Sequence, residues 1–215
     1  KDSTKLPWKE LDIDVVVEST GLFTSYLGSK FHLDQGAKHV VISAPAKDVL
    51  ENADGSAAIQ TPTILLGVNE EKFGTCPITS NASCTTNAAS PLIAIMHEAI
   101  GIEKAILNTV HGYTASQALV DGPSKKDLRE GRAAAQNIVP SSTGAAIAVA
   151  KAFPALDGLF DGISIRVPVP AGSIVDVTFI AKRDTTAEEV NAILQKAAMD
   201  DRWHGIFSVT DEPLV

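Results

Sequence analysis

The fold is decided in the stretch Pro77-Ile78-Thr79-Ser80-Asn81-Ala82-Ser83-Cys84-Thr85-Thr86-Asn87, where an extended run gives way to a helical pattern. Apolar residues then recur at helical spacing until Gly101. Cys84 is therefore expected in the first turn of a helix, where backbone N–H groups are unpaired and the helix dipole is positive. Both features favour thiolate over thiol, so the sulfur of Cys84 is a candidate nucleophile.

The residues before this stretch alternate between strand and helix patterns. Short apolar runs at 13–18 and 39–43 predict two strands, and the stretch between them, at about 25–35, predicts a helix closed by Gly36. A further strand is predicted at 63–68. Apolar strands that alternate with helices are typical of a parallel sheet covered on both faces. The first part of the chain is thus predicted to be α/β, with a partial doubly wound parallel sheet.

The pattern changes after Cys84, and long strands replace short ones. Thr186 to Glu189 form a capping box that predicts the start of a helix. Long strands with helices gathered separately fit an α+β domain with a mainly antiparallel sheet. The predicted elements are helices at about 86–100, 144–150 and 186–198, strands at 102–110, 163–167 and 174–181, and a strand start at 205–209. The stretch 114–140 is long for a connection, which points to function or an interface.

Composition limits the classes of function. The chain has 215 residues, 45% hydrophobic and 20% charged, which is ordinary for a globular protein with a sizeable core. Its net charge of −8 argues against nucleic acid or an anionic membrane as the main partner. No apolar run reaches the roughly 18 residues that span a bilayer. Cys76 and Cys84 form no CxxC motif, no metal-ligand spacing is present, and a reducing cytosol is expected, with Cys76 as a small apolar residue.

A nucleophilic Cys84 needs a base, and His111 is the candidate. It ends the strand predicted after the Cys84 helix. A helix followed by a strand that runs back would bring the end of the strand near the start of the helix, as a Cys–His pair requires. A histidine with a purely structural role is the alternative. The remaining histidines fit surface or core roles or a turn: His32, His39, His97 and His204.

Two helix starts suit a bound anion. The N–H of Cys84 is suited to an oxyanion, and the hydroxyls of Ser83 and Thr85 with nearby N–H groups suit a phosphate. Another helix is predicted to begin at Thr143 and Gly144, which gives a second possible anion-binding site. An ordinary N-cap is the alternative at both places.

Arg166 is the remaining candidate ligand of an anion. It lies in a predicted strand between Ile165 and Val167, so its side chain is expected to be half-buried. A half-buried arginine usually has an anionic partner. That partner is either a bound phosphate or a structural carboxylate.

These motifs resemble those of the phosphorylating glyceraldehyde-3-phosphate dehydrogenases. The matching blocks follow the order of that family over nearly the whole chain: 18–23, 41–45, 82–87, 120–123, 136–146 and 166–170. The resemblance implies that residues 1–83 are part of a Rossmann-type NAD(P)-binding domain and residues 84–215 a catalytic domain. It also implies a fragment that lacks the start of the nucleotide-binding domain and the C-terminal end.

The resemblance implies an oxidoreductase of glycolysis. Cys84 would attack the aldehyde of glyceraldehyde 3-phosphate, and His111 would hold the oxyanion and take the proton as hydride leaves for the nicotinamide. The cofactor would be NAD, with NADP as the alternative. Inorganic phosphate would then release 1,3-bisphosphoglycerate from the thioester on Cys84. The family also implies a cytoplasmic homotetramer without nucleic-acid or membrane partners.

By the same resemblance, the remaining site residues fall into three groups. Thr114 and Arg166 would hold the phosphate of the substrate. The attacking phosphate would contact Ser83, Thr85, Thr143 and Gly144. The cofactor cleft would be lined by Ser19, Thr20, Gly21, Phe23 and Ser43. Two alternatives stay open: an erythrose-4-phosphate dehydrogenase of the same superfamily, and a non-catalytic protein-binding role for the acidic surface.

Overall fold

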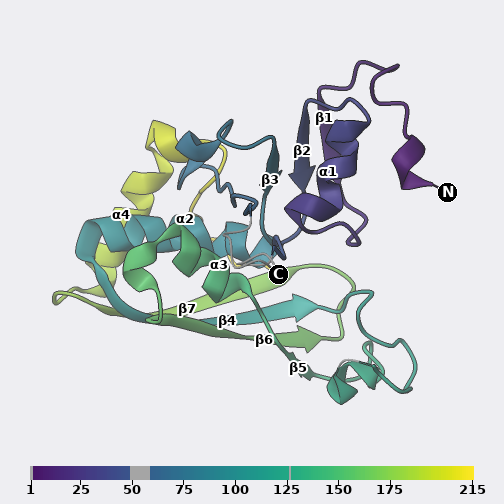
Figure 1. The fold of residues 1–215 in the computed structure, drawn as a ribbon. Coiled ribbons are helices and arrows are strands. Elements are labelled where there is room, and N and C mark those ends of the chain that lie inside the picture. Colours follow the sequence, from purple (N-terminus) through teal and green to yellow (C-terminus); the bar gives the residue numbers. More distant parts are fainter. Residues whose placement is uncertain (1, 49–58, 126) are drawn as a thin grey trace. The chain divides into compact units, whose positions relative to one another are not determined.

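The computed structural model describes residues 2–48, 59–125 and 127–215 (Figure 1). The chain divides into two compact units, Lys1–Pro91 and Leu92–Val215. Each unit is an α/β arrangement around its own sheet. The functional boundary predicted between residues 83 and 84 stays a prediction, because a division into compact units does not say which residues bind cofactor and which react.

The sheet of the first unit has three parallel strands in the order β1-β2-β3, as predicted. Helix α1 lies between β1 and β2 in the chain and packs against β2 and β3. Its start is fixed by Ser25, whose side chain accepts a hydrogen bond from the N–H of Gly28. The bounds are β1 (Val15–Glu18), α1 (Tyr26–Asp34), β2 (His39–Ile42) and β3 (Ile78–Ser80).

Burial in this sheet follows the period of two that strands impose. Val40, Ile42 and Ile78 form a fully buried cluster under α1. On β1, Val16 and Glu18 are buried, whereas Val15 and Val17 on the other face are exposed. One face of the sheet is therefore covered. Because the three strands are parallel, their carboxyl ends lie at the same edge of the sheet.

The strand predicted at 63–68 is wrong. Only Thr63 forms a bridge, a parallel one to Ser80. After it the chain turns, because the N–H of Leu65 donates to Oδ1 of Asn69 at 2.7 Å and Gly67 takes a left-handed φ of 74°. The Leu65 side chain is nonetheless buried, and that burial is what the apolar run reflects.

The second unit contains a four-stranded sheet in the order β5-β6-β4-β7. Strands β4 and β6 are parallel, while β4–β7 and β5–β6 are antiparallel, which confirms the mainly antiparallel sheet. Helix α2 runs into β4 through Gly101, at a left-handed φ of 73°. The bounds are α2 (Cys84–Ile100), β4 (Ile102–Gly112), β5 (Val139–Ser141), α3 (Ala145–Ala152), β6 (Phe160–Val167), β7 (Ser173–Ala181) and α4 (Ala187–Ala198).

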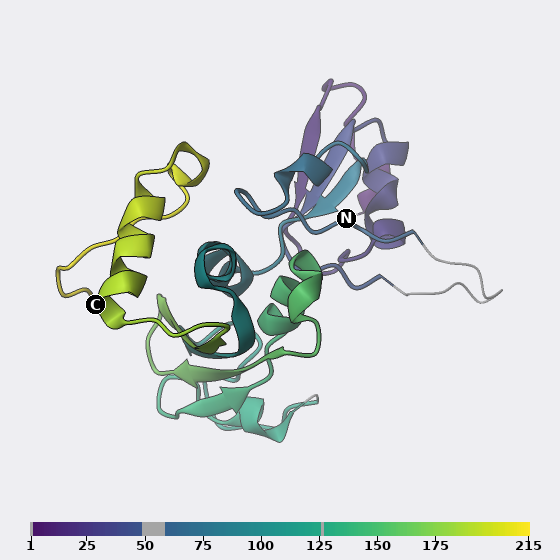
Figure 2. The same cartoon turned by 90° about the vertical axis from the view of Figure 1, so that its left-hand side faces the viewer.

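One face of this sheet is covered, and α3 packs against β6 there (Figure 1, Figure 2). Leu107 and Thr109 of β4 and Ser164 of β6 point to the covered face and are buried. Gly162 lets β6 lie close to both neighbours, since a Cβ at that position would be 2.8 Å from the carbonyl oxygen of Leu107 on β4 and 3.5 Å from Cβ of Ala146 on α3. The register therefore assigns every other residue of β4 and β6 to this covered face.

The long stretch at 114–140 is ordered by its own backbone hydrogen bonds. The N–H of Gly122 donates to the carbonyl of Gly131 at 2.9 Å, and the N–H of Ala134 donates to the carbonyl of Ala118 at 2.9 Å. The two arms of the loop are thus tied together. The short 3-10 helices of the chain are η1 (Ser3–Lys5), η2 (Glu70–Lys72), η3 (Leu128–Gly131), η4 (Pro154–Leu156) and η5 (Asp201–Trp203).

The predicted capping box at the start of α4 is confirmed. The Thr186 side chain accepts a hydrogen bond from the N–H of Glu189 at 3.2 Å. The hydrogen bonds from Arg183 and Thr185 lower the pKa of Glu189 to about 2. The strand start predicted at 205–209 is wrong, because Trp203 accepts backbone hydrogen bonds from Ile206 and Phe207, which makes a turn.

Candidate active site

Cys84 is the first residue of α2, as predicted, and its side chain is exposed. Ser83 caps the helix, because its Oγ accepts the N–H of Thr86 at 3.1 Å and lies 2.8 Å from the hydroxyl of Thr86. The buried Thr85 places its hydroxyl 3.9 Å from the sulfur of Cys84. An exposed thiol therefore lies at the positive end of a helix, with the hydroxyl of Thr85 beside it.

The turn before Cys84 is held in an unusual conformation. Ala82 has a left-handed φ of 61° and is buried, which costs about 1–2 kcal/mol for a residue with a Cβ. The side-chain amide of Asn87 donates to the carbonyls of Asn81 at 2.7 Å and Ser83 at 2.9 Å. This turn aims the chain from β3 into α2 and fixes the position of the Cys84 backbone.

His111 lies near the end of β4, opposite Arg166 in the register with β6. Its Nδ1 is 2.6 Å from Nη1 of Arg166 and 2.6 Å from the carbonyl oxygen of Gly112. The guanidinium can only donate and the carbonyl can only accept, so Nδ1 satisfies one of them at a time. While Arg166 donates, the proton of neutral His111 belongs on Nε2.

Arg166 has the features of an anion ligand that lacks its anion. Its Nε is buried without a hydrogen-bond partner. Among the residues that the structure describes, no carboxylate forms a salt bridge with Arg166. Thr114, which follows β4, is exposed, and its hydroxyl lies 3.2 Å from Oγ of Ser116. The second unit thus brings His111 and Arg166 together at one end of the sheet.

The second predicted anion seat lies at the start of α3. Gly144 is the N-cap and Oγ1 of Thr143 accepts the N–H of Ala145 at 3.1 Å. This bond makes a turn just before α3, and the N-cap residue itself, Gly144, has no side chain that caps the helix. The hydroxyl hydrogen of Thr143 is not used by that bond and can still be donated to an anion.

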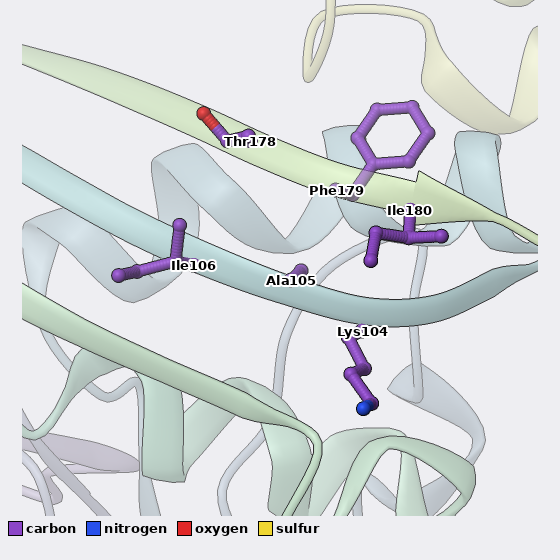
Figure 3. Close-up of a pocket in the computed structure, with 6 residues that line it drawn as sticks. All are labelled: Lys104, Ala105, Ile106, Thr178, Phe179 and Ile180. Atoms are coloured by element: carbon purple, nitrogen blue, oxygen red, sulfur yellow. The ribbon is translucent and has the colours of Figure 1, made fainter.

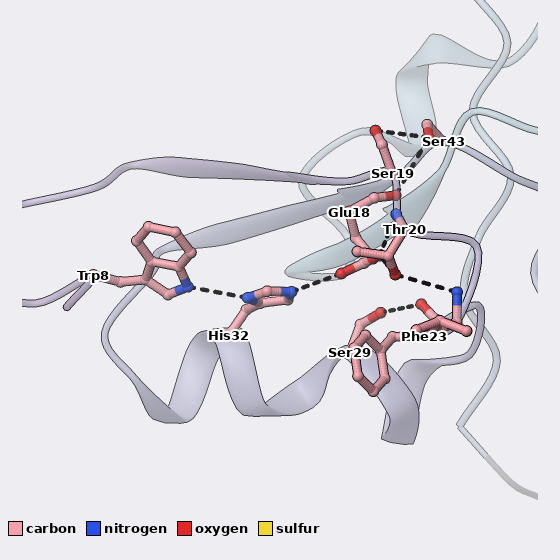
Figure 4. Close-up of polar contacts among 9 residues, drawn as sticks. Trp8, Glu18, Ser19, Thr20, Phe23, Ser29, His32 and Ser43 are labelled. Carbon is pink, nitrogen blue, oxygen red and sulfur yellow. Dashed lines mark hydrogen bonds and ion pairs between the residues drawn. The ribbon is translucent and has the colours of Figure 1, made fainter. Parts of the chain in front are cut away.

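The predicted cofactor residues gather after the carboxyl ends of β1 and β2 (Figure 4). The hydroxyl of Ser43 donates to Oγ of the exposed Ser19 at 2.9 Å. Gly21 has a left-handed φ of 74°, and the carbonyl of Phe23 accepts the hydroxyl of Ser29 at 2.7 Å. Nucleotides bind at this end of parallel strands in doubly wound sheets.

The sequence did not reveal one polar network behind this edge. Glu18 is buried at the end of β1, where it contacts His32 of α1 and Thr20. Burial raises the pKa of Glu18, but hydrogen bonds from Thr20 and His32 outweigh it, and the net pKa is lowered. The sequence signal for this network is an acidic residue that ends an apolar strand, whereas His32 within a helical pattern predicts only an ordinary core or surface role.

The two candidate reacting residues belong to different units. Cys84 lies in the first unit and His111 in the second. Their pairing stays a prediction. Among the residues that the structure describes, no group of three His, Cys, Asp or Glu side chains is arranged to hold a metal ion, and no helix is long and apolar enough to cross a membrane.

Fold and site together define a two-unit α/β protein with an exposed cysteine at the start of the helix that runs from one unit into the other. Residues 83–215 match the family model for the C-terminal domain of glyceraldehyde 3-phosphate dehydrogenase. The chain therefore belongs to the glyceraldehyde-3-phosphate dehydrogenase family, which confirms the resemblance seen in the sequence.

Curated relatives agree with this assignment. The chain is 48% identical over 211 residues to the glyceraldehyde-3-phosphate dehydrogenase of Mycobacterium avium, covering 98% of this chain and 58% of the relative. It is 44% identical over 215 residues to glyceraldehyde-3-phosphate dehydrogenase B of Aspergillus oryzae, covering 100% of this chain and 60% of that relative. The chain thus spans about 58–60% of the length of these relatives.

Proposed function

We propose that the protein is a phosphorylating aldehyde dehydrogenase that oxidises glyceraldehyde 3-phosphate in glycolysis. The observation that carries the proposal is the exposed thiol of Cys84 at the start of α2, in a chain of this family. Its sulfur would attack the aldehyde carbon, and the helix N–H groups would stabilise the oxyanion that forms. Loss of hydride then leaves a thioester on Cys84, which inorganic phosphate cleaves to 1,3-bisphosphoglycerate.

His111 would serve as the base for this step. The lengths of the connecting elements support the proposal, since α2 has 17 residues and β4 has 11. At about 1.5 Å per helical residue and 3.3 Å per strand residue, α2 is about 25 Å long and the strand as far as His111 about 33 Å, so a strand that returned along the helix would reach its start. Nδ1 of His111 faces Nη1 of Arg166, so a contact with the sulfur would be made by Nε2.

Arg166 and Thr114 would hold the phosphate of the substrate, and the buried, unpartnered Nε of Arg166 supports this role. The attacking phosphate would be held by Ser83, Thr85, Thr143 and Gly144. The first turns of α2 and α3 supply backbone N–H dipoles that favour an anion there. Neutralising both phosphates would let two anionic reactants meet at one sulfur.

NAD, or alternatively NADP, would accept the hydride when bound. Ser19 and Ser43 fit a dinucleotide because their hydroxyls stand together after the ends of two parallel strands. Gly21 and Phe23 would complete the lining of the cleft. Thr20 donates both its N–H and its hydroxyl to Glu18, so it would support the turn that carries Ser19.

We also propose that the protein is a cytoplasmic homotetramer. The uncovered face of the second sheet presents Ile106, Ile163, Ile174 and Ile180, with exposed fractions of 50%, 52%, 68% and 56%. Ile106 and Ile180 line a shallow hollow on β4 and β7 (Figure 3). Apolar side chains gathered on one sheet face are typical of a surface that another subunit covers.

Charge on this face should disrupt the assembly. Replacing Ile163 with Asp is expected to convert the tetramer into smaller species, because a carboxylate would be desolvated at the contact. Sedimentation velocity measures the change. Met199→Asp, at an exposed apolar residue of the same unit, is the control and should stay tetrameric. An unchanged tetramer in Ile163→Asp would remove this face from the interface.

The substrate assignment is tested by nucleotide reduction with two aldehydes. The protein as its gene encodes it should reduce NAD faster with glyceraldehyde 3-phosphate than with erythrose 4-phosphate, and only when phosphate is present. A preference for erythrose 4-phosphate would identify the alternative dehydrogenase. No turnover with either aldehyde would favour the non-catalytic role.

A further inference from the structure

A chain of hydrogen bonds runs from the N-terminal segment to the predicted cofactor edge (Figure 4). Nε1 of Trp8 donates to Nδ1 of His32 at 3.0 Å. Nε2 of His32 lies 3.0 Å from Oε2 of Glu18. Oε1 of Glu18 accepts the backbone N–H of Thr20 at 2.8 Å and also the hydroxyl of Thr20. Four residues from three segments of the chain thus form one connected network.

The network fixes the tautomer of His32. An indole nitrogen can only donate, so Nδ1 of His32 must be the acceptor and the ring proton must lie on Nε2. That proton is then donated to Oε2 of Glu18. His32 and Glu18 are both buried, with side chains 6% and 3% exposed, so water does not replace either partner. The donor and acceptor in each hydrogen bond of the network are therefore set by those in the bond before it.

The far end of the network uses up the polar groups of Thr20. Its N–H and its hydroxyl both donate to Glu18, and its Oγ1 accepts the N–H of Leu22 at 3.2 Å. Thr20 has no hydrogen left to donate to a ligand. Ser19 differs: while Ser43 donates to its Oγ at 2.9 Å, its own hydrogen is left to donate outward, and the carbonyl of Glu18, 3.3 Å from Oγ of Ser43, is the competing acceptor. Thr20 therefore makes its hydrogen bonds inside the turn, whereas Ser19 is exposed to solvent.

We propose that Glu18 and His32 are positioning residues for the dinucleotide, and that Thr20 acts inside the turn and does not contact the ligand. The network would hold the turn at residues 19–21 so that Ser19 donates to an acceptor oxygen of the dinucleotide. This inference rests on the proposed function, which supplies the dinucleotide. The geometry of the network itself is independent of that function.

Glu18→Gln is the most informative substitution. The new amide can still accept from Thr20, but its NH₂ would face the N–H at Nε2 of His32. Moving the ring proton to Nδ1 would relieve that contact and create a new one with the indole N–H of Trp8. We expect the KM for NAD to rise about three- to tenfold in the complete protein, the scale of one or two hydrogen bonds, with little change in kcat.

Trp8→Phe tests the donor and acceptor roles of the two His32 ring nitrogens. Without the indole donor, His32 is free to carry its proton on Nδ1 and to accept the new amide at Nε2. The double variant Trp8→Phe/Glu18→Gln should therefore bind NAD more tightly than the product of the two single effects predicts. His39→Asn, at an exposed histidine on β2, is the control and should leave the KM unchanged.

Nitrogen NMR of histidine-labelled wild-type protein reads the tautomer without any activity. A proton on Nε2 of His32 and a slowly exchanging Trp8 indole N–H are expected. A proton on Nδ1, or additive effects in the double variant, would overturn the inference. Wild-type protein with the expected tautomer but no affinity for NAD would overturn the proposed function and confirm the network alone.

Discussion

Replacing Cys84 with serine is expected to lower phosphate-dependent reduction of NAD by glyceraldehyde 3-phosphate by about a thousandfold or more. Serine fits the first position of α2 as well as cysteine does, so the helix and its Ser83 cap should be retained. What is lost is the nucleophilic sulfur, because a serine hydroxyl is a much weaker nucleophile than a cysteine thiol. Steady-state rates at saturating aldehyde and nucleotide measure the loss.

Cys76→Ser is the matched control, since it removes the other thiol, which is half-buried and lies outside the helix. It should keep nearly the full rate. Iodoacetamide at neutral pH gives an independent measurement, with Cys84 expected to react much faster than Cys76. A Cys84→Ser protein that kept a tenth of the wild-type rate would exclude a covalent role for this sulfur.

Local signals in the sequence were enough to predict most of the elements. Ser25 and Gly36 marked the ends of α1, and the capping box at Thr186 marked the start of α4. The run at 63–68 failed because an apolar run cannot distinguish a strand from a buried turn. In this run the side chain of Asn69 accepts the N–H of Leu65, which a strand would have needed to pair with a neighbouring strand.

Contacts between distant residues were beyond the same reasoning. His111 and Arg166 were each named as candidates, but their contact follows from the register of β4 on β6, which the sequence does not state. The pairing of His32 with Glu18 likewise depends on where α1 lies over the sheet. Residue chemistry is readable from sequence, whereas the partner of a polar group is a property of the tertiary fold.

The second large effect is expected at Arg166. Replacing it with Met should lower kcat/KM for glyceraldehyde 3-phosphate about a hundredfold or more, the scale for losing one partner of a desolvated charge pair. Arg166→Lys should recover only part of this loss, because an ammonium cannot match the planar fork of a guanidinium. Arg183→Met is the control, since Arg183 is exposed and bound to Glu189.

Unphosphorylated glyceraldehyde makes the measurement specific. Wild-type protein should turn it over poorly, and Arg166→Met should change that rate far less than the rate with the phosphorylated substrate. The contact between Arg166 and the phosphate would position the aldehyde for reaction. Only a substrate that carries a phosphate can therefore lose binding energy when Arg166 is replaced. Equal losses with both aldehydes would instead mean that Arg166 acts through its contact with Nδ1 of His111, 2.6 Å away, and that the phosphate is bound elsewhere.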